Sequence, residues 1–480
     1  MNLFLKKPVN PIVVESEGGG HTLKRTLSAT SLVSLGIGAI IGAGLFSLTG
    51  IAAAENAGPA VVLSFIVAAV GCAFAGMCYS ELATMIPVAG SAYTYAYATM
   101  GELIAWVIGW DLVLEYAVGA ATVAVSWSRY VVSFLHDWGI NLPAQLVLCP
   151  FEIAKMPDGT QASGIVNLPA MLIICMVSLL LMRGIQESAQ VNSVIVVIKV
   201  AVVLAFIGVG MWYIKTANYV PYIPANTGTF GEFGWSGVMR AAGVIFFAYI
   251  GFDTVSTAAQ EAKNPQRDIP IGIIGSLLIC TVLYVAFATV LTGMVNYHTM
   301  KGDAAPVATA INLTPFPWLQ KMVKMGIICG FTSVLLVLLL GQSRVFYSMS
   351  RDGLLPKLFS DIHRTWRTPW RSNLIFMVFV SLFTGFLPIS KLGHMTSIGT
   401  LLAFVIVCAG VLVLRTTQPD IPRPYKTPCV PWFPLLGILI CFSMMYSLPG
   451  ETWWRLVIWL AVGMVVYFSY SRFHSKLRKR

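Results

Sequence analysis

Four glycines interrupt a segment that is otherwise apolar enough to cross a membrane. Residues 36–46 read GIGAIIGAGLF, and a helix is expected to break there. A break at bilayer depth leaves N–H and C=O groups that lipid cannot satisfy, so it is tolerated only where it faces protein or a water-filled cavity. A second interrupted stretch, FFAYIGFD at 246–253, follows about five spans later. Paired breaks in corresponding halves of a chain indicate the substrate site of a transporter.

The composition places this chain in a bilayer. Of its 480 residues, 57% are hydrophobic and 11% are charged, whereas soluble proteins carry roughly 25% charged residues. Each crossing needs roughly 20 apolar residues. About twelve such stretches are present, centred near residues 42, 72, 117, 176, 203, 249, 281, 335, 381, 404, 440 and 462. The predicted fold class is therefore an all-α integral membrane protein with about 12 transmembrane helices.

The positions of the two breaks predict a repeat. Five spans in each half open with a broken helix, so we expect a 5+5 inverted repeat with broken helices 1 and 6, and the breaks meeting near the midplane. Two additional C-terminal helices lie outside the repeat. The expected division is a cytoplasmic segment 1–26, a first repeat 27–216, a second repeat 217–415, helices 11 and 12 in 416–471, and a basic cytoplasmic tail 472–480.

The distribution of positive charge predicts orientation. The net charge of +11 would suit a nucleic-acid binder, but 21 of the 31 lysines and arginines fall in segments that are internal if the N-terminus is cytoplasmic. This bias obeys the positive-inside rule, so we expect a multi-pass protein of the cell (plasma) membrane, surrounded by lipid, with both termini cytoplasmic and no nucleic-acid partner. The sequence leaves the oligomeric state open, a monomer included.

Motifs for cofactors and metals are missing from the sequence. The nine cysteines show no CxxC or metal-ligand spacing, so neither a disulfide nor a metal site is expected. No Walker A sequence is present, and we expect no cofactor and no direct use of ATP.

The two ends of a broken helix complement both charges of an amino acid. N–H groups around Ala43, Gly44 and Leu45 are expected to bind the carboxylate, with help from the helix dipole. Carbonyl groups left open by the two breaks are expected to accept the ammonium. Helix packing through Gly38 and Gly42 is the competing interpretation, but it does not explain the second break. The expected carbonyls belong to Ile40, Ile41, Phe247, Ala248 and Ile250.

Lys199 stands alone in the apolar run 194–200, which reads VIVVIKV. A lysine within a membrane span costs several kcal/mol and is functional by default. Removal from water disfavours its charged form, so a proton can exchange there. We interpret Lys199 as a built-in cation between the first and eighth spans that couples transport to protons, with the hydroxyls of Thr332 and Ser333 as partners. A structural ammonium that only ties spans together is the alternative.

Three acids fall in or beside the predicted spans. Asp111 and Glu115 are four residues apart on the third span, so they share one helix face, which must turn inward. Glu115 is either a proton carrier acting with Lys199 or a brace for the broken sixth span. We interpret Asp111 and Asp253 as braces, the latter by bonding amides freed at the second break.

Three further residues could act at the edges of the site. Phe247 is expected to lie over the substrate as an aromatic gate, or else only to pack. Leu338 or its neighbour Leu339 in the eighth span, if it lines the pocket, would shorten the space for a side chain and so favour small neutral substrates. Glu81, near the inner end of the second span, is expected to cap a helix or pair with the Arg-rich loop 351–371.

Taken together, these segments resemble the amino acid-polyamine-organocation superfamily, and among its members the bacterial relatives of cationic amino acid transporters. The resemblance implies the five-plus-five fold with two appended spans, alternating access and amino acid transport. It also implies that Lys199 is similar to the lysine of proton-coupled or sodium-independent carriers, and that Ala43 replaces a serine or threonine that would contact substrate. The matching motifs lie in 36–46, 79–95, 109–116, 246–253, 264–273 and 350–356.

We therefore predict a secondary active carrier that takes up small or broad neutral L-amino acids with protons, bound between spans 1, 3, 6 and 8. A carrier or exchanger for arginine, lysine or a polyamine is the alternative among transporters. A non-transporting amino acid sensor is less expected, because the sequence shows no signalling domain. A channel would need a continuous polar stripe and an enzyme a catalytic cluster, and the sequence contains neither.

Overall fold

The computed structural model describes residues 3–7, 27–86, 91–150, 153–155, 161–184, 189–257 and 262–478. Most of the predicted segment 1–26, residues 87–90 of the matching motif, and the last two residues of the predicted tail lie outside this part of the chain. Within it, eight helices are long and apolar enough to cross a membrane, and four shorter apolar helices accompany them. The longest run, Gly44–Met85, combines the second half of the first span with the whole second span.

These helices account for the twelve predicted crossings. The first span comprises α2 (Ala29–Ile40), the π-helical segments Gly44–Leu48 and Ala53–Ala57, and α3 (Thr49–Ala52) between them. The sixth comprises α10 (Gly234–Ile245), a 3₁₀ turn Phe246–Tyr249 and α11 (Phe252–Thr257). The other spans are α4 (Val61–Met85), α6 (Glu102–His136), α8 (Leu168–Met182), α9 (Ala189–Gly210), α12 (Pro265–Met294), α14 (Pro317–Arg351), α15 (Trp370–Phe386), α16 (Ile389–Thr417), α17 (Trp432–Ser447) and α18 (Gly450–Val466).

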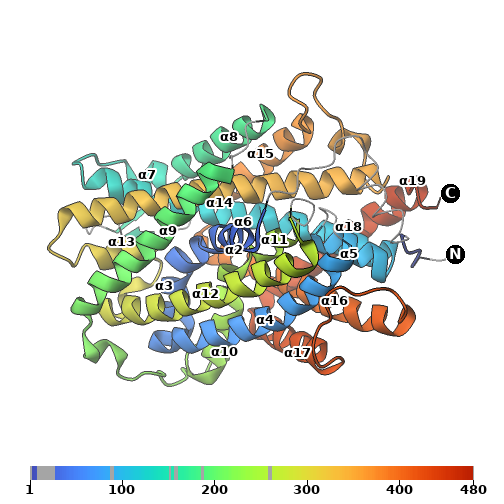
Figure 1. The fold of residues 1–480 in the computed structure, drawn as a ribbon. Helices are drawn as coiled ribbons and strands as arrows, with labels where there is room; N and C mark the ends of the chain where they lie inside the picture. Colours follow the sequence, from blue (N-terminus) through green and yellow to red (C-terminus); the bar gives the residue numbers. More distant parts are fainter. Residues whose placement is uncertain are drawn as a thin grey trace.

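Short elements connect the spans. The loop after α6 carries α7 (Ala144–Val147) and an antiparallel hairpin of β1 (Ile153–Lys155) and β2 (Gln161–Ser163), in which Ile153 pairs with Ser163. The remaining short helices are α5 (Ser91–Thr99), α13 (Pro306–Ile311) and α19 (Arg472–His474). The broken spans run through the middle of the bundle, packed among α4, α6, α12, α14 and α16 (Figure 1).

Glu81 joins the C-terminal ends of α4 and α16. Its carboxylate, 1% exposed, accepts hydrogen bonds from Arg415 Nε and NH2, both at 2.9 Å, and from the backbone N–H of Thr427 at 2.7 Å. Arg423 Nε lies 3.4 Å from it. The prediction that Glu81 pairs with the loop 351–371 is therefore wrong. Because α16 packs along α4 and ends beside Glu81, the arginines at the end of α16 and just after it reach the carboxylate instead.

Both ends of the chain dock where α6 begins and α14 ends. The backbone N–H of Glu102 donates to Leu5 O at 3.0 Å, and Lys7 Nζ lies 3.1 Å from Asp352 Oδ1. From the other terminus, Arg478 Nε and the Tyr467 hydroxyl donate to Glu102 Oε1 at 2.8 and 2.9 Å. The two termini consequently lie at the same end of the bundle (Figure 1).

Candidate functional site

The first break separates α2 from the second half of its span. α2 ends at Ile40, and Ile41 is extended, with φ −71° and ψ 106°. The second half begins near Gly44, and the first N–H groups of a helix have no partner within it. One expected donor is already used, because Leu45 N donates to Gly42 O at 3.2 Å. The N–H groups of Ala43 and Gly44 remain at the start of the second half.

The second break lies between the 3₁₀ turn and α11. Ile250 is extended, with φ −60° and ψ 134°, and its N–H donates to Phe247 O at 3.2 Å. Gly251 follows with φ 126°, a conformation that favours glycine. Asp253 Oδ1 accepts a hydrogen bond from Gly251 N at 3.2 Å, and Thr254 donates from its hydroxyl to Gly251 O at 2.5 Å. These two side chains brace the break from the start of α11.

The two breaks touch each other through glycine. A Cβ atom on Gly44 would lie 2.2 Å from Ala248 Cα, and one on Gly251 would lie 2.7 Å from the carbonyl carbon of Ala39. Both contacts are with backbone or Cα atoms, which cannot move aside. Glycine at these positions therefore allows the two main chains to approach closely, so the glycines predicted to serve binding also serve packing.

Tyr284 of α12 links the same two segments. Its buried hydroxyl lies 2.9 Å from Ile40 O and 3.0 Å from Ala248 O. These are two of the carbonyls expected to accept an ammonium. A hydroxyl has one hydrogen and each carbonyl has two lone pairs, so acceptor capacity remains at this point.

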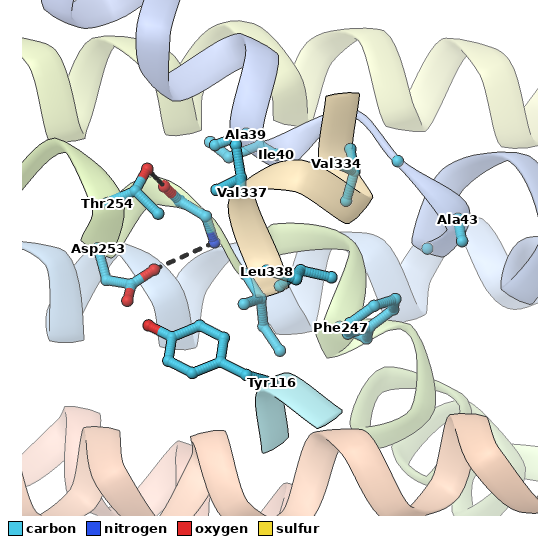
Figure 2. Close-up of a pocket in the computed structure, with 14 residues that line it drawn as sticks. Ala39, Ile40, Ala43, Tyr116, Phe247, Asp253, Thr254, Val334, Val337 and Leu338 are labelled. Carbon is cyan, nitrogen blue, oxygen red and sulfur yellow. Dashed lines mark hydrogen bonds between the residues drawn. The ribbon is translucent and has the colours of Figure 1, made fainter. Parts of the chain in front are cut away.

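A cavity lies beside the breaks. In Figure 2, Tyr116 reaches in from α6 with its hydroxyl toward Asp253, and Leu338 and Phe247 lie across the opposite side. Phe247 and Leu338 meet over Gly119, where an added Cβ would lie 3.3 and 3.7 Å from them. Apart from Asp253, Thr254 and Tyr116, the side chains around it are apolar. Its lining comprises Ala39, Ile40, Gly42, Ala43, Gly44, Tyr116, Phe247, Ile250, Gly251, Asp253, Thr254, Val334, Val337 and Leu338.

Most of the predicted binding residues line this cavity. Ile41 and Ala248 do not: Ile41 is fully buried beside the break, and Ala248 packs against Gly44. The sequence does not predict Ala39, Tyr116, Gly251, Thr254, Val334 and Val337, which also line the cavity. Val334 had a detectable signal, because it precedes Leu338 by one helical turn and shares its face.

Lys199 lies between the first and eighth spans. Its side chain is 1% exposed, and Nζ donates to Gly38 O at 2.7 Å. Its stem passes Gly330 of α14, where an added Cβ would lie 3.1 Å from Cγ and Cε. Of its two expected partners, Ser333 is buried in α14. The hydroxyl of Thr332 accepts a hydrogen bond from Trp127 Nε1 at 3.1 Å and donates to Ile328 O.

The two acids of α6 face α16. A Cβ on Gly399 would lie 2.9 Å from both carboxylate oxygens of Asp111. Glu115, 5% exposed, is hydrogen-bonded to Thr400, and its Oε2 has no partner among the described residues. In the part of the chain that the structure describes, no group of three or more His, Cys, Asp or Glu could hold a metal ion.

Comparison with known proteins gives relatives that match this chain over most or all of its length. The model of the family described as amino acid permease matches residues 27–467. A methylthioribose transporter of Bacillus subtilis (strain 168) is 44% identical over 479 residues, with 100% of both chains covered. A branched-chain amino acid permease, BcaP, of the same organism is 43% identical over 484 residues, covering 100% of this chain and 99% of the relative. A vacuolar cationic amino acid transporter 4 of Arabidopsis thaliana is 38% identical over 421 residues, covering 87% of this chain and 68% of the relative.

Proposed function

Since this chain belongs to the amino acid permease family of the amino acid-polyamine-organocation superfamily, we propose that it carries neutral L-amino acids with small or branched apolar side chains, coupled to protons. Membership of this family makes it a multi-pass membrane transporter and not an enzyme. Both termini are assigned to the cytoplasm, because they share one end of the bundle and that end carries the positive charge.

The observation that carries the proposal is the meeting of two main-chain breaks beside an apolar wall. The N–H groups of Ala43 and Gly44, at a helix start, suit a carboxylate, and the remaining acceptor capacity around Ile40 suits an ammonium. Val334, Val337 and Leu338 line the cavity from α14, so a bound side chain would meet hydrocarbon. Opening the cavity alternately to each side of the membrane would then move the substrate.

Two other substrates have support. Methylthioribose is an uncharged candidate, because the relative named for its transport is as similar to this chain as BcaP is. A cationic amino acid is favoured by Asp253, the one acid lining the cavity, and by the plant relative. Asp253 Oδ1 is already bonded to Gly251 N, so we rank the uncharged substrates higher.

Uptake into proteoliposomes separates these substrates. We expect labelled leucine to enter against its gradient when the outside is acidic, and unlabelled valine or isoleucine to compete. Unlabelled arginine and methylthioribose in the same assay test the other candidates. If only arginine competes, the proposal for neutral substrates is wrong.

Proton coupling is assigned to Lys199, with Glu115 as a second group. A charged ammonium holds the carbonyl of Gly38 on the inner half of the first span, and loss of its proton would weaken that bond. We expect Lys199→Ala to lose accumulation driven by a pH gradient while leucine exchange at equal pH continues, since exchange needs no net driving force. Full accumulation by this variant would refute the coupling role.

A further inference from the structure

An exposed basic surface surrounds the inner ends of α8, α14 and α15. Within the described residues, Arg183, Arg364 and Arg367 are exposed and form no ion pair. The acid beside them, Asp361, is paired with Arg371 at 2.9 Å. Among the described residues, no neighbouring side chain therefore neutralises the positive charge of these three arginines.

The loop that carries this surface has a defined shape. Thr368 Oγ1 donates to Met182 O at the end of α8 at 2.5 Å. His363 N donates to Thr368 O, and Arg367 N donates to His363 O, both at 2.9 Å. These bonds close the tip of the loop and fix it beside Arg183, as its position near α8 and α15 also indicates (Figure 1).

Apolar side chains on the same loop place it at the membrane boundary. Leu358, Ile362 and Trp366 are 39%, 46% and 42% exposed, and the Trp366 ring stacks on His363 at 4.2 Å. The exposed apolar faces of α8 and α15 begin directly beside them, with Leu179 52% and Val378 54% exposed. Tryptophan and long basic side chains beyond a lipid-facing surface are typical of the headgroup region.

We propose that Arg183, Arg364 and Arg367 bind the phosphate groups of anionic phospholipids while Leu358, Ile362 and Trp366 contact the acyl chains. The combination of unpaired arginines, exposed apolar side chains and continuity with the lipid-facing helices fits a phospholipid better than a soluble polyanion. Lipid bound there would join the end of α8 to the start of α15 and stabilise that side of the bundle. The proposal does not depend on which substrate is carried.

Thermal unfolding of the full chain in detergent, titrated with phosphatidylglycerol or phosphatidylcholine, tests this site. We expect phosphatidylglycerol to raise the melting temperature more than phosphatidylcholine does. Salt at 0.5 M should reduce this difference between the two lipids, because the Debye length falls to roughly 4 Å. In the double variant Arg183→Gln/Arg364→Gln, the half-saturating amount of phosphatidylglycerol should rise about 30-fold. This value follows from a contribution of about 1 kcal/mol for each of the two basic residues removed near the membrane surface. A second variant, Arg364→Gln/Arg367→Gln, should behave alike.

The control is Lys215→Gln/Lys391→Gln, which removes the same charge from exposed lysines at the opposite end of the bundle. It should respond to phosphatidylglycerol as the unmodified protein does. Equal effects of the two lipids, an unchanged response in both arginine variants, or an equal loss in the control would overturn the proposal. Inorganic phosphate or a DNA oligonucleotide that reproduces the stabilisation would assign the surface to another anion.

Discussion

Single glycines determine whether the two broken helices can meet. Gly44 and Gly42 are two residues apart, yet their surroundings differ. An added Cβ would lie 2.2 Å from Ala248 Cα at Gly44, but 3.4 Å from the nearest atom of Val334 at Gly42. The second distance is an ordinary contact, so the two positions form a matched pair for mutation.

We expect Gly44→Ala to reduce both stability and uptake, because the new methyl group meets main chain that cannot shift. Overpacking of this kind costs about 1–3 kcal/mol or more. Gly42→Ala should fold and unfold like the unmodified protein. Melting temperature and leucine uptake, measured on both variants, check this. Equal behaviour of the two would mean that the close approach at Ala248 is not required.

At the scale of elements, local composition predicts the breaks and the number of spans. The glycines of 36–46 and the FFAYIGFD stretch lie where the structure interrupts the first and sixth spans. Break positions depend on residues in the broken segment itself, which is why sequence alone reveals them. The inverted relation between the two halves stays a prediction.

Contacts between distant elements could not be read from the sequence. Nothing in α12 indicates that Tyr284 bonds the carbonyls of Ile40 and Ala248, 244 and 36 residues away. The loop with the most arginines is the predicted partner of Glu81, whereas the structure pairs Glu81 with Arg415 at the end of α16 and with Arg423 just after it. Charge counts show where opposite charges are available, but packing decides which of them a buried carboxylate reaches.

The contact of α4 with α16 depends on one buried carboxylate. Removing one partner of a buried ion pair costs about 3–5 kcal/mol, and Glu81→Gln should fall in this range, because Arg415 stays partly in water but the Arg423 side chain is only 4% exposed. The side chain of Arg415 is 26% exposed. Glu451→Gln is the control, because Glu451 pairs with Arg455 while 77% exposed, and surface pairs contribute little. Thermal unfolding in detergent compares them; a similar small loss in both would contradict the assigned role.

At the scale of the whole molecule, the two termini close one end of the bundle. Glu102 is fully buried and Arg478 is 11% exposed. We expect Arg478→Ala to lower the free energy of unfolding by about 3 kcal/mol, at the low end for a buried pair because hydroxyl donors remain. Lys476→Ala removes the same charge from an exposed side chain and keeps the backbone N–H that donates to Asp352 O. Unfolding temperatures of the two variants should differ clearly, and matching values would show that the tail does not stabilise the bundle.

This pairing also imposes an order on biosynthesis. Glu102 and Arg478 are 376 residues apart. The ribosome therefore synthesises the third span, which begins at Glu102, long before it adds the arginine whose guanidinium pairs with the Glu102 carboxylate. A ribosome that stops early releases a chain with an uncompensated carboxylate at the bilayer edge. Such a product would lack the contacts by which the tail stabilises this end of the bundle, and we expect it to unfold more readily.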